Sequence, residues 1–79
     1  MAELQTTLHD IAAAIVDSPD EVKVIREEDD TTITLTLTVA PDDMGKVIGR
    51  HGRIAKAIRT VIKAASAECG KRVNVEIRD

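Results

Sequence analysis

The sequence predicts an α+β domain in which three helices pack on one face of a three-stranded mixed sheet, in the order α-β-β-α-α-β. Two segments carry aliphatic residues at helical spacing, and three others alternate between aliphatic and polar residues, as half-buried strands do. Two predicted helices separate the second strand from the third, which suits a right-handed crossover between parallel neighbours. These observations predict a single domain over residues 1–79.

The first element is predicted to be a helix over residues 2–17. Its apolar stripe consists of Leu4, Leu8, Ile11 and Ile15, widened by Ala12 and Val16. The sequence Ser18-Pro19-Asp20 ends this helix, because proline and its polar neighbours favour a turn. A helix with one apolar face is expected to pack against the sheet that follows it.

Two strands come next, and the turn at Asp29 and Asp30 joins them as a hairpin. The first strand covers residues 22–28. In the second strand the aliphatic and polar residues alternate most cleanly: Ile33, Leu35, Leu37 and Val39 against Thr32, Thr34, Thr36 and Thr38. The last strand of the chain repeats the pattern with Val73, Val75 and Ile77 against Arg72, Asn74, Glu76 and Arg78. Each strand therefore has one face for the core and one outside.

Two helices are predicted between the second and third strands. Residues 40–43 end the strand and open a short helix through Ile48, since proline and two aspartates suit a helix start. A turn at Gly49–Gly52 leads into the longer helix, and Gly70 is a plausible stop for it. One side of this helix is expected to carry Ile54, Ala57, Ile58, Val61, Ile62 and Ala65, and the other Arg53, Lys56, Arg59 and Lys63.

Composition narrows the class of protein. The chain has no Phe, Tyr or Trp, so aliphatic residues supply the core, and binding of single strands by aromatic stacking is disfavoured. A chain of 79 residues buries one modest core, and association with a second copy or a partner would add to its stability. The single cysteine, Cys69, excludes an internal disulfide and a thiolate metal cluster, and is interpreted as a small filler near a helix end.

The net charge of −3 combines two halves of opposite sign. Residues 1–44 hold eleven acidic and two basic residues, whereas residues 45–79 hold three acidic and nine basic ones. Such a division is compatible with two solvated faces and no ligand. It also places a local basic patch around the glycine turn, and a local patch decides binding because distant exposed charges are screened.

The stretch from Val47 to Ile54 reads V-I-G-R-H-G-R-I, and it is the most informative part of the chain. Two glycines allow a tight turn, and the start of the following helix offers N–H groups at its partly positive end. Arg50 and Arg53 add full positive charge. This combination suits a phosphate group. The alternative is a helix–turn–helix linker without a ligand.

This stretch, placed between two helices in this order of elements, resembles the type II KH domain, and more closely the small single-KH bacterial proteins of the KhpA family. Residues 39–49 and 53–59 carry the likeness, with a core motif at about 31–79. The resemblance implies that the loop clamps the backbone of about four nucleotides of single-stranded RNA, sometimes DNA, with bases in an aliphatic groove. It further implies an RNA chaperone or post-transcriptional regulator that pairs with a KhpB-like KH protein and is linked to cell shape and cell-wall biogenesis.

The predicted RNA-binding residues centre on the loop. They are Gly49, Arg50, His51, Gly52, Arg53, Lys46, Lys56, Val47 and Ile54. Arg50 offers a planar fork to phosphate, and Val47 and Ile54 could border the bases. Ile48 and Ile58 are expected in the core, although periodicity favours the core for any one of these four aliphatic residues. Arg59 and Lys63 are expected on the solvated helix surface.

Several features are interpreted without a ligand. His9 has no metal-ligand companion one helical turn away, so it is expected at the surface, and Glu27–Asp30 is expected to be a solvated hairpin tip that repels nucleic acid. Gly45 either permits a close approach or is simply tolerated in a helix.

No cofactor is expected. The sequence contains no Walker A motif, no dinucleotide-binding fingerprint and no evident catalytic set. It also contains no apolar run of the ~20 residues that a membrane span needs, and no signal peptide, so a cytoplasmic protein is expected. Two functions therefore remain: a non-catalytic binder of single-stranded RNA, or a dimerisation or adapter module with little RNA binding of its own.

Overall fold

A computed structural model describes residues 3–67 and 70–79. The predicted order of elements is confirmed. The helices are α1 (Glu3–Ile15), α2 (Met44–Ile48) and α3 (Arg53–Ala65), and the strands are β1 (Lys23–Glu28), β2 (Thr32–Thr38) and β3 (Arg72–Arg78). Short 3-10 turns lie at Pro19–Glu21, Pro41–Asp43 and Arg50–Gly52. Residue 2 of the predicted first helix, and Cys69 with its predicted filler role, fall outside the described residues.

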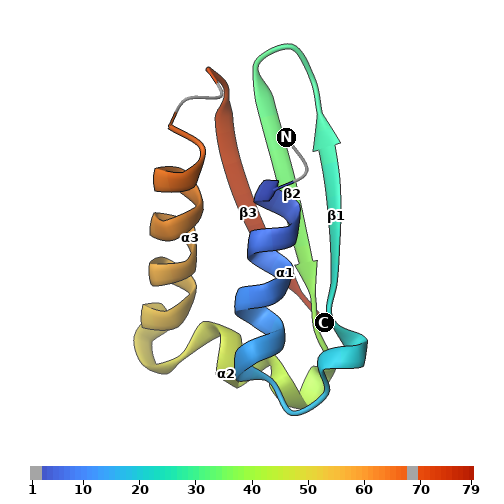
Figure 1. Cartoon of the computed structure of the whole chain (residues 1–79). Helices are drawn as coiled ribbons and strands as arrows, with labels where there is room; N and C mark the ends of the chain where they lie inside the picture. The colour runs from blue at the N-terminus through green and yellow to red at the C-terminus, as the bar shows by residue number, and fades with distance from the viewer. Residues whose placement is uncertain (1–2, 68–69) are drawn as a thin grey trace.

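The sheet has the predicted mixed topology, with strand order β1-β2-β3 (Figure 1). β1 and β2 form the antiparallel hairpin, in which Ile25 lies opposite Thr36. β2 and β3 run parallel, with Leu35 opposite Val75. The crossover between these parallel strands contains both α2 and α3. The α2–α3 turn lies at the end of the sheet where β2 and β3 finish (Figure 1).

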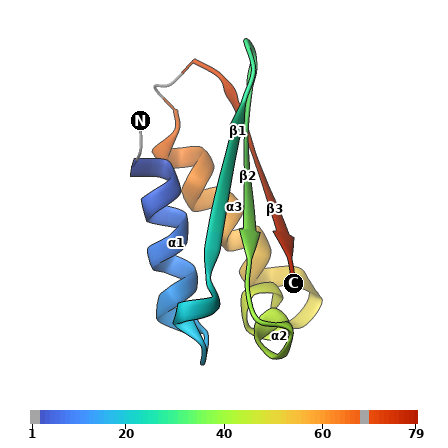
Figure 2. The ribbon, with the colours of Figure 1, turned by 90° about the vertical axis from the view of Figure 1, so that its right-hand side faces the viewer.

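The helices form one layer against one face of the sheet. Figure 2 shows α1 and α3 side by side on that face, with the other face uncovered. The much shorter α2 lies at the end of the layer and packs on α3 and α1 rather than across the strands (Figures 1 and 2). The turn that follows α2 is therefore held at one tip of the molecule.

The core lies between the sheet and the helix layer, and aliphatic residues form it. Its fully buried members include Leu8, Leu35, Leu37, Val47 and Ile62. Along β2 the alternation works as predicted, because the aliphatic residues are buried and the threonines are only half-buried on the open face. Burial of these side chains is the main force that holds the layers together.

Helix α3 is the element where the predicted core is wrong in part. Only Ala55, Ile58 and Ile62 of its helical residues are buried. Three others on the predicted apolar side are exposed, namely Ala57, Val61 and Ala65. Ile54 on the same side is also exposed, and it was expected to border the bases. The apolar arc of the helix is wider than its contact with the sheet and α1, since α3 lies at the edge of the layer (Figure 1). The helix also ends at Ala65, before the predicted stop at Gly70.

Candidate nucleic-acid interface

The turn between α2 and α3 has a backbone that L-residues rarely adopt. Gly49 has φ 75° and ψ 173°, and Gly52 has φ 73° and ψ 15°. Between them, His51 also has a positive φ of 58°. The two glycines thus occupy conformations in which a side chain is strained, which explains the need for glycine at both ends of the turn.

Gly49 has a second reason to be glycine. A Cβ atom at this position would lie 2.6 Å from Cγ1 of Ile54, well inside van der Waals contact. The close approach of the Gly49 backbone to Ile54 packs the turn against the first residues of α3. At Gly52 no atom lies within 4 Å of such a Cβ, so there only the backbone conformation favours glycine.

The N–H groups at the two ends of the turn are hydrogen-bonded within the chain, and those in the middle are not. The Gly49 N–H donates to the Gly45 carbonyl at 2.9 Å, and the Gly52 N–H donates to the Gly49 carbonyl at 3.1 Å. Within the described residues, no hydrogen bond engages the N–H groups of Arg50 and His51, whose side chains are exposed. Two adjacent main-chain donors therefore remain available to an external acceptor.

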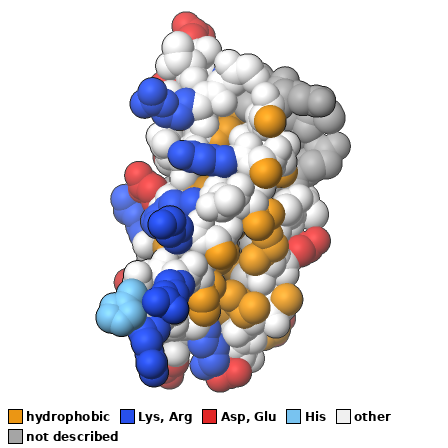
Figure 3. Space-filling view, turned by 90° about the vertical axis from the view of Figure 1, so that its left-hand side faces the viewer, with side chains coloured by type: hydrophobic (Ala, Val, Ile, Leu, Met, Phe, Trp, Pro, Cys, Tyr) orange, Lys and Arg blue, Asp and Glu red, His pale blue; other side chains and the backbone are white. Residues whose placement is uncertain are grey.

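Positive charge surrounds these two donors. Arg50, Arg53 and Lys56 are all exposed, and His51 is exposed beside them. Figure 3 shows Lys and Arg side chains gathered along one flank of the helical surface, with hydrophobic side chains next to them. Free N–H donors among arginines and a lysine form a site that attracts an anion such as phosphate.

Lys46 differs from the other cations because it already has acidic partners. Its Nζ lies 3.0 Å from Oδ2 of Asp17 and 3.6 Å from Oδ1 of Asp43. The hydrogen bond with Asp17 raises the pKa of Lys46 above its usual value. The structure therefore brings Lys46 near the turn, as predicted, but ties it to the loop that follows α1.

Asp43 organises the junction below the turn, and sequence reasoning assigned it only a helix-start role. Its carboxylate is almost completely buried and accepts hydrogen bonds from the N–H groups of Asp17 and Ser18, each at 3.1 Å. Burial opposes the charge, but these two donors and Lys46 lower the pKa of Asp43 below its usual value. No local pattern signals this role, because the donors lie far away in sequence.

The aliphatic residues around the turn sort differently from the prediction. Val47, expected to border the bases, is fully buried in the core, whereas Ile48, expected in the core, is exposed. Ile58 is buried as expected, and Ile54 is exposed beside Gly49. The α2 helix has only five residues, so hydrophobic periodicity could not define which of its faces points inward. Ile48 and Ile54 thus replace Val47 as the apolar surface next to the turn.

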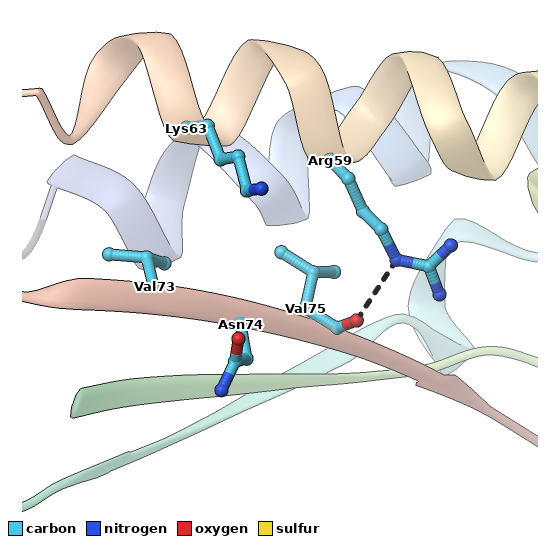
Figure 4. A pocket seen from close by; sticks show the side chains of 5 residues that line it. All are labelled: Arg59, Lys63, Val73, Asn74 and Val75. Carbon is cyan, nitrogen blue, oxygen red and sulfur yellow. Dashed lines mark hydrogen bonds between the residues drawn. The ribbon is translucent and has the colours of Figure 1, made fainter.

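A hollow of about 160 Å³ lies between α3 and β3 (Figure 4). Its lining residues are Arg59, Lys63, Val73, Asn74 and Val75. Arg59 and Lys63 were expected to be solvated helix surface. Both are exposed, as expected. In addition, the Nε–H of Arg59 donates to the Val75 carbonyl at 3.2 Å, and Lys63 reaches over the same hollow (Figure 4). The side chain of Arg59 therefore bridges the helix and the free edge of the sheet.

The opposite flank of α3 is apolar and exposed. We call Ile54, Ala57, Val61 and Ala65 the α3 apolar strip. Val61 is 47% exposed and Ile54 is 38% exposed, so the strip presents two branched aliphatic side chains to solvent, about two helical turns apart. An apolar strip beside a basic flank favours contact with another molecule over simple solvation.

The remaining candidate features carry no sign of a ligand. His9 is half-exposed, and its Nδ1 lies 3.3 Å from Oδ1 of its neighbour Asp10. Gly45 has open space around its α-carbon, so nothing in the chain requires a glycine there. Across residues 3–67 and 70–79, no three His, Cys, Asp or Glu side chains are grouped as a metal site would need. In the same residues, no helix has both the length and the apolar character to span a bilayer.

Comparison with known proteins places the chain among close relatives. The family model described as KhpA/KhpB, KH domain, matches residues 5–77. A Clostridium acetobutylicum protein named RNA-binding protein KhpA is 58% identical over 94% of this chain and 99% of its own length. Proteins of the same name from Caldanaerobacter subterraneus and Bacillus subtilis are 54% and 49% identical, over 98% and 96% of this chain and 99% and 94% of theirs.

Proposed function

The chain belongs to the KhpA/KhpB family of KH domains, and we propose that it is a non-catalytic protein that binds single-stranded RNA with its α2–α3 turn. Its relatives carry the name RNA-binding protein, and the family is not catalytic. The observation that carries the proposal is the pair of unengaged N–H groups at Arg50 and His51, set among exposed cations. A phosphate of the RNA backbone accepts from these two donors.

The side chains around the turn hold the neighbouring phosphates. Arg50 and Arg53 can each offer two parallel donors to one phosphate, and Lys56 follows one turn further along α3. Lys46 contributes only when it leaves Asp17, from which it is 3.0 Å away. Gly49 and Gly52 contribute by keeping the main chain open to a close approach.

The bases lie beside the backbone, against aliphatic surface rather than aromatic rings. Ile48 and Ile54 offer exposed apolar surface next to the turn, and the hollow between α3 and β3 offers a second surface on the other flank of α3. The chain has no aromatic residue on which a base could stack. Affinity therefore depends strongly on phosphate contacts, and it should fall steeply as salt concentration rises.

The double variant Arg50→Asp/His51→Asp tests this proposal. It reverses the charge beside the two N–H donors without touching a buried residue. Affinity for a short single-stranded RNA at low salt should fall by more than about tenfold, with a shallower salt dependence and an unchanged melting temperature. The matched control is Arg72→Asp, since Arg72 is an exposed cation at the start of β3, the end of the strand away from the turn. RNA binding that survives the double change at low salt would show that the turn is not the clamp.

A second function, as a dimerisation or adapter module, is favoured by the α3 apolar strip. Its four exposed apolar residues cover nearly the whole of one helix flank, and covering that flank with a partner would remove apolar surface from water. We propose a second copy of this chain or a KhpB-like KH protein as the partner. A homodimer or heterodimer would also place two RNA sites together and raise the weak affinity of a single site.

Sedimentation of the Val61→Asp variant tests the module. Because Val61 is exposed, the change should leave the fold intact and convert a dimer into a monomer. A dimer that persists in Val61→Asp would exclude the strip as the interface. A tight dimer that is indifferent to RNA would favour the adapter function over RNA binding.

The biological role that we propose is that of a cytoplasmic RNA chaperone and post-transcriptional regulator. A small site that holds the RNA backbone without stacking the bases suits transient, weakly selective binding, which a chaperone needs. We expect the protein to make two complementary RNA strands anneal faster, and a fluorescence assay measures the rate of annealing. The Arg50→Asp/His51→Asp variant should lose this acceleration. Acceleration that survives in the variant would separate chaperone activity from the turn.

A further inference from the structure

We propose that Arg59 makes the Val75 end of the hollow between α3 and β3 selective for bases with a carbonyl group at C4 of a pyrimidine or C6 of a purine over bases with an amino group at that position. The inference rests on the proposed RNA binding and adds a base preference to it. It depends on which hydrogen-bonding groups line the hollow and which of them are already engaged.

The free edge of β3 supplies the main-chain groups of the hollow. Arg72 donates its N–H to the Thr31 carbonyl, and the Arg78 carbonyl accepts from Val39, so the even-numbered residues of β3 bond toward β2. In a parallel strand the alternate residues then direct their main-chain groups away from the neighbour. The hydrogen bond from Arg59 to the Val75 carbonyl confirms that Val75 faces this free edge.

Arg59 engages the main-chain acceptor at the end of the hollow nearest the turn. Its Nε–H donates a hydrogen bond to the Val75 carbonyl at 3.2 Å. Its two terminal NH₂ groups have no acceptor within the described residues, and Figure 4 shows them beyond the Val75 carbonyl, on the side away from Lys63. The guanidinium is thus held by one bond and presents the rest of its donors to a ligand.

The other polar side chains of the hollow strengthen this bias. Lys63 can only donate, and none of the lining residues is acidic. The amide of Asn74, which could accept, points to the opposite side of β3 (Figure 4). The carbonyl of Val73 lies further from the turn, so the bias applies to the base beside Arg59. At that position the guanidinium offers several free donors, whereas the Val75 carbonyl already accepts one hydrogen bond.

The bases differ in the hydrogen-bonding groups that they present to these donors. Guanine presents O6 and N7 as acceptors, and uracil presents O4 as thymine does. Cytosine presents the N4 amino group and adenine the N6 amino group, both of which need an acceptor. A base with an amino group at this edge would leave its donor unpaired against the donors of Arg59, which is unfavourable. Uracil should therefore bind better than cytosine, and hypoxanthine better than adenine.

The test compares short oligouridine with oligocytidine, and oligoinosine with oligoadenosine, for the full chain at one salt concentration. The wild-type protein should prefer the carbonyl-bearing member of each pair by roughly tenfold, which corresponds to one well-placed hydrogen bond. In Arg59→Ala the Val75 carbonyl becomes free to accept from an amino group. The preference should then disappear or reverse, although overall affinity also falls.

Two further variants separate base reading from charge. Arg59→Lys keeps the charge but lacks the planar fork, so it should lose most of the preference while keeping most of the affinity. Lys63→Ala is the matched control, because it removes a cation from the same hollow without freeing Val75, and the preference should remain.

Two results would overturn the inference alone: equal binding of both members of each pair by the wild-type protein, or an Arg59→Ala variant whose affinity falls equally for all four oligomers. Failure of the wild-type protein to bind any oligomer would instead reject RNA binding itself, and the base preference with it.

Discussion

The β1–β2 turn and the α2–α3 turn lie at opposite ends of the molecule and treat their main-chain N–H groups differently (Figure 1). At the β1–β2 turn, Oδ1 of Asp29 accepts from the N–H groups of Thr31 at 2.9 Å and Thr32 at 2.8 Å. At the α2–α3 turn, the N–H groups of Arg50 and His51 have no acceptor in the described part of the chain. The first turn therefore engages the N–H groups of Thr31 and Thr32 internally, whereas the second leaves two adjacent N–H groups open to an anionic ligand.

Charge separates the two turns in the same sense. Acidic residues at 27–30 surround the β1–β2 turn, and Lys71 pairs with Glu28 at its base. Cations surround the α2–α3 turn. The hydrogen bonds from Thr31 and Thr32 lower the pKa of Asp29, so its carboxylate stays charged to a lower pH than an ordinary aspartate. On the proposed function, a phosphate site needs both open N–H groups and local positive charge, and only the α2–α3 turn has the two together.

The largest effect is expected when a side chain is added to the backbone of the α2–α3 turn. Gly49→Ala places a Cβ 2.6 Å from Ile54 in a backbone region that is essentially restricted to glycine. We expect the protein to lose about 3 kcal/mol of unfolding free energy, measured by chemical denaturation, and to lose RNA binding.

Gly45→Ala is the matched control, because Gly45 lies in α2 with open space around it. Removing a glycine from a helix should stabilise the protein by about 0.5–1 kcal/mol. A Gly49→Ala variant as stable as Gly45→Ala would show that the backbone of the turn is not restricted to glycine.

The next largest effect concerns the buried carboxylate beneath the open turn. Asp43→Asn removes a charge that accepts from Asp17 and Ser18 and should lower the melting temperature at neutral pH. Because the pKa of Asp43 is lowered, its contribution to stability is complete above the ordinary value of 3.8 and is lost as pH falls through the lower folded-state value.

The difference in unfolding free energy between the wild type and Asp43→Asn should therefore be constant at neutral pH and shrink in acid below pH 3.8. The exposed neighbour provides the control, since Asp42→Asn should leave the melting temperature nearly unchanged. A difference that does not depend on pH would mean that the charge of Asp43 is not what ties α1 to α2.

Opening the β1–β2 turn sharpens the comparison. Asp29→Ala frees the N–H groups of Thr31 and Thr32 and should lower the melting temperature modestly. RNA affinity should not increase, because the neighbouring acidic residues repel phosphate. Gel-shift or anisotropy measurements on this variant would contradict the account if the opened turn gained RNA binding, since free N–H groups would then be sufficient.

The smallest effect should come from releasing Lys46. Asp17→Asn removes the partner 3.0 Å from its Nζ and leaves Asp43 at 3.6 Å, so Lys46 becomes more available to phosphate. Because Asp17 is largely exposed and the pair is screened, we expect RNA affinity to rise only about twofold. Asp20→Asn changes the net charge equally at another exposed residue and should have less effect. Equal gains in both variants would mean that net charge, and not Lys46, is responsible.

The fold could be predicted from sequence largely because its signals are local. The aliphatic and threonine residues of β2 define both a strand and its buried face, and the length of the crossover implied the parallel pair. The faces of α2 could not be predicted, since five residues are too few to define a periodicity. Val47 was therefore expected at the surface and Ile48 in the core, the reverse of what the structure shows. Along α3, aliphatic character suggested burial for Val61, but the edge position of the helix leaves it exposed.

The sequence was sufficient to predict the glycine turn of the candidate site, but not the residues that pack around it. Gly49 and Gly52 are recognisable because few sequences place two glycines around a basic pair between helices. The roles of Asp43 and Arg59 depend on partners distant in sequence, namely the loop after α1 and the free edge of β3. Only the three-dimensional arrangement brings these residues to the site.

The most direct test of the account follows individual amide signals by NMR while a short single-stranded RNA is added. The N–H groups of Arg50 and His51 should shift most, and those of Thr31 and Thr32, already bonded to Asp29, should stay in place. Shifts centred on the threonine face of the sheet, with Arg50 and His51 unmoved, would contradict the account.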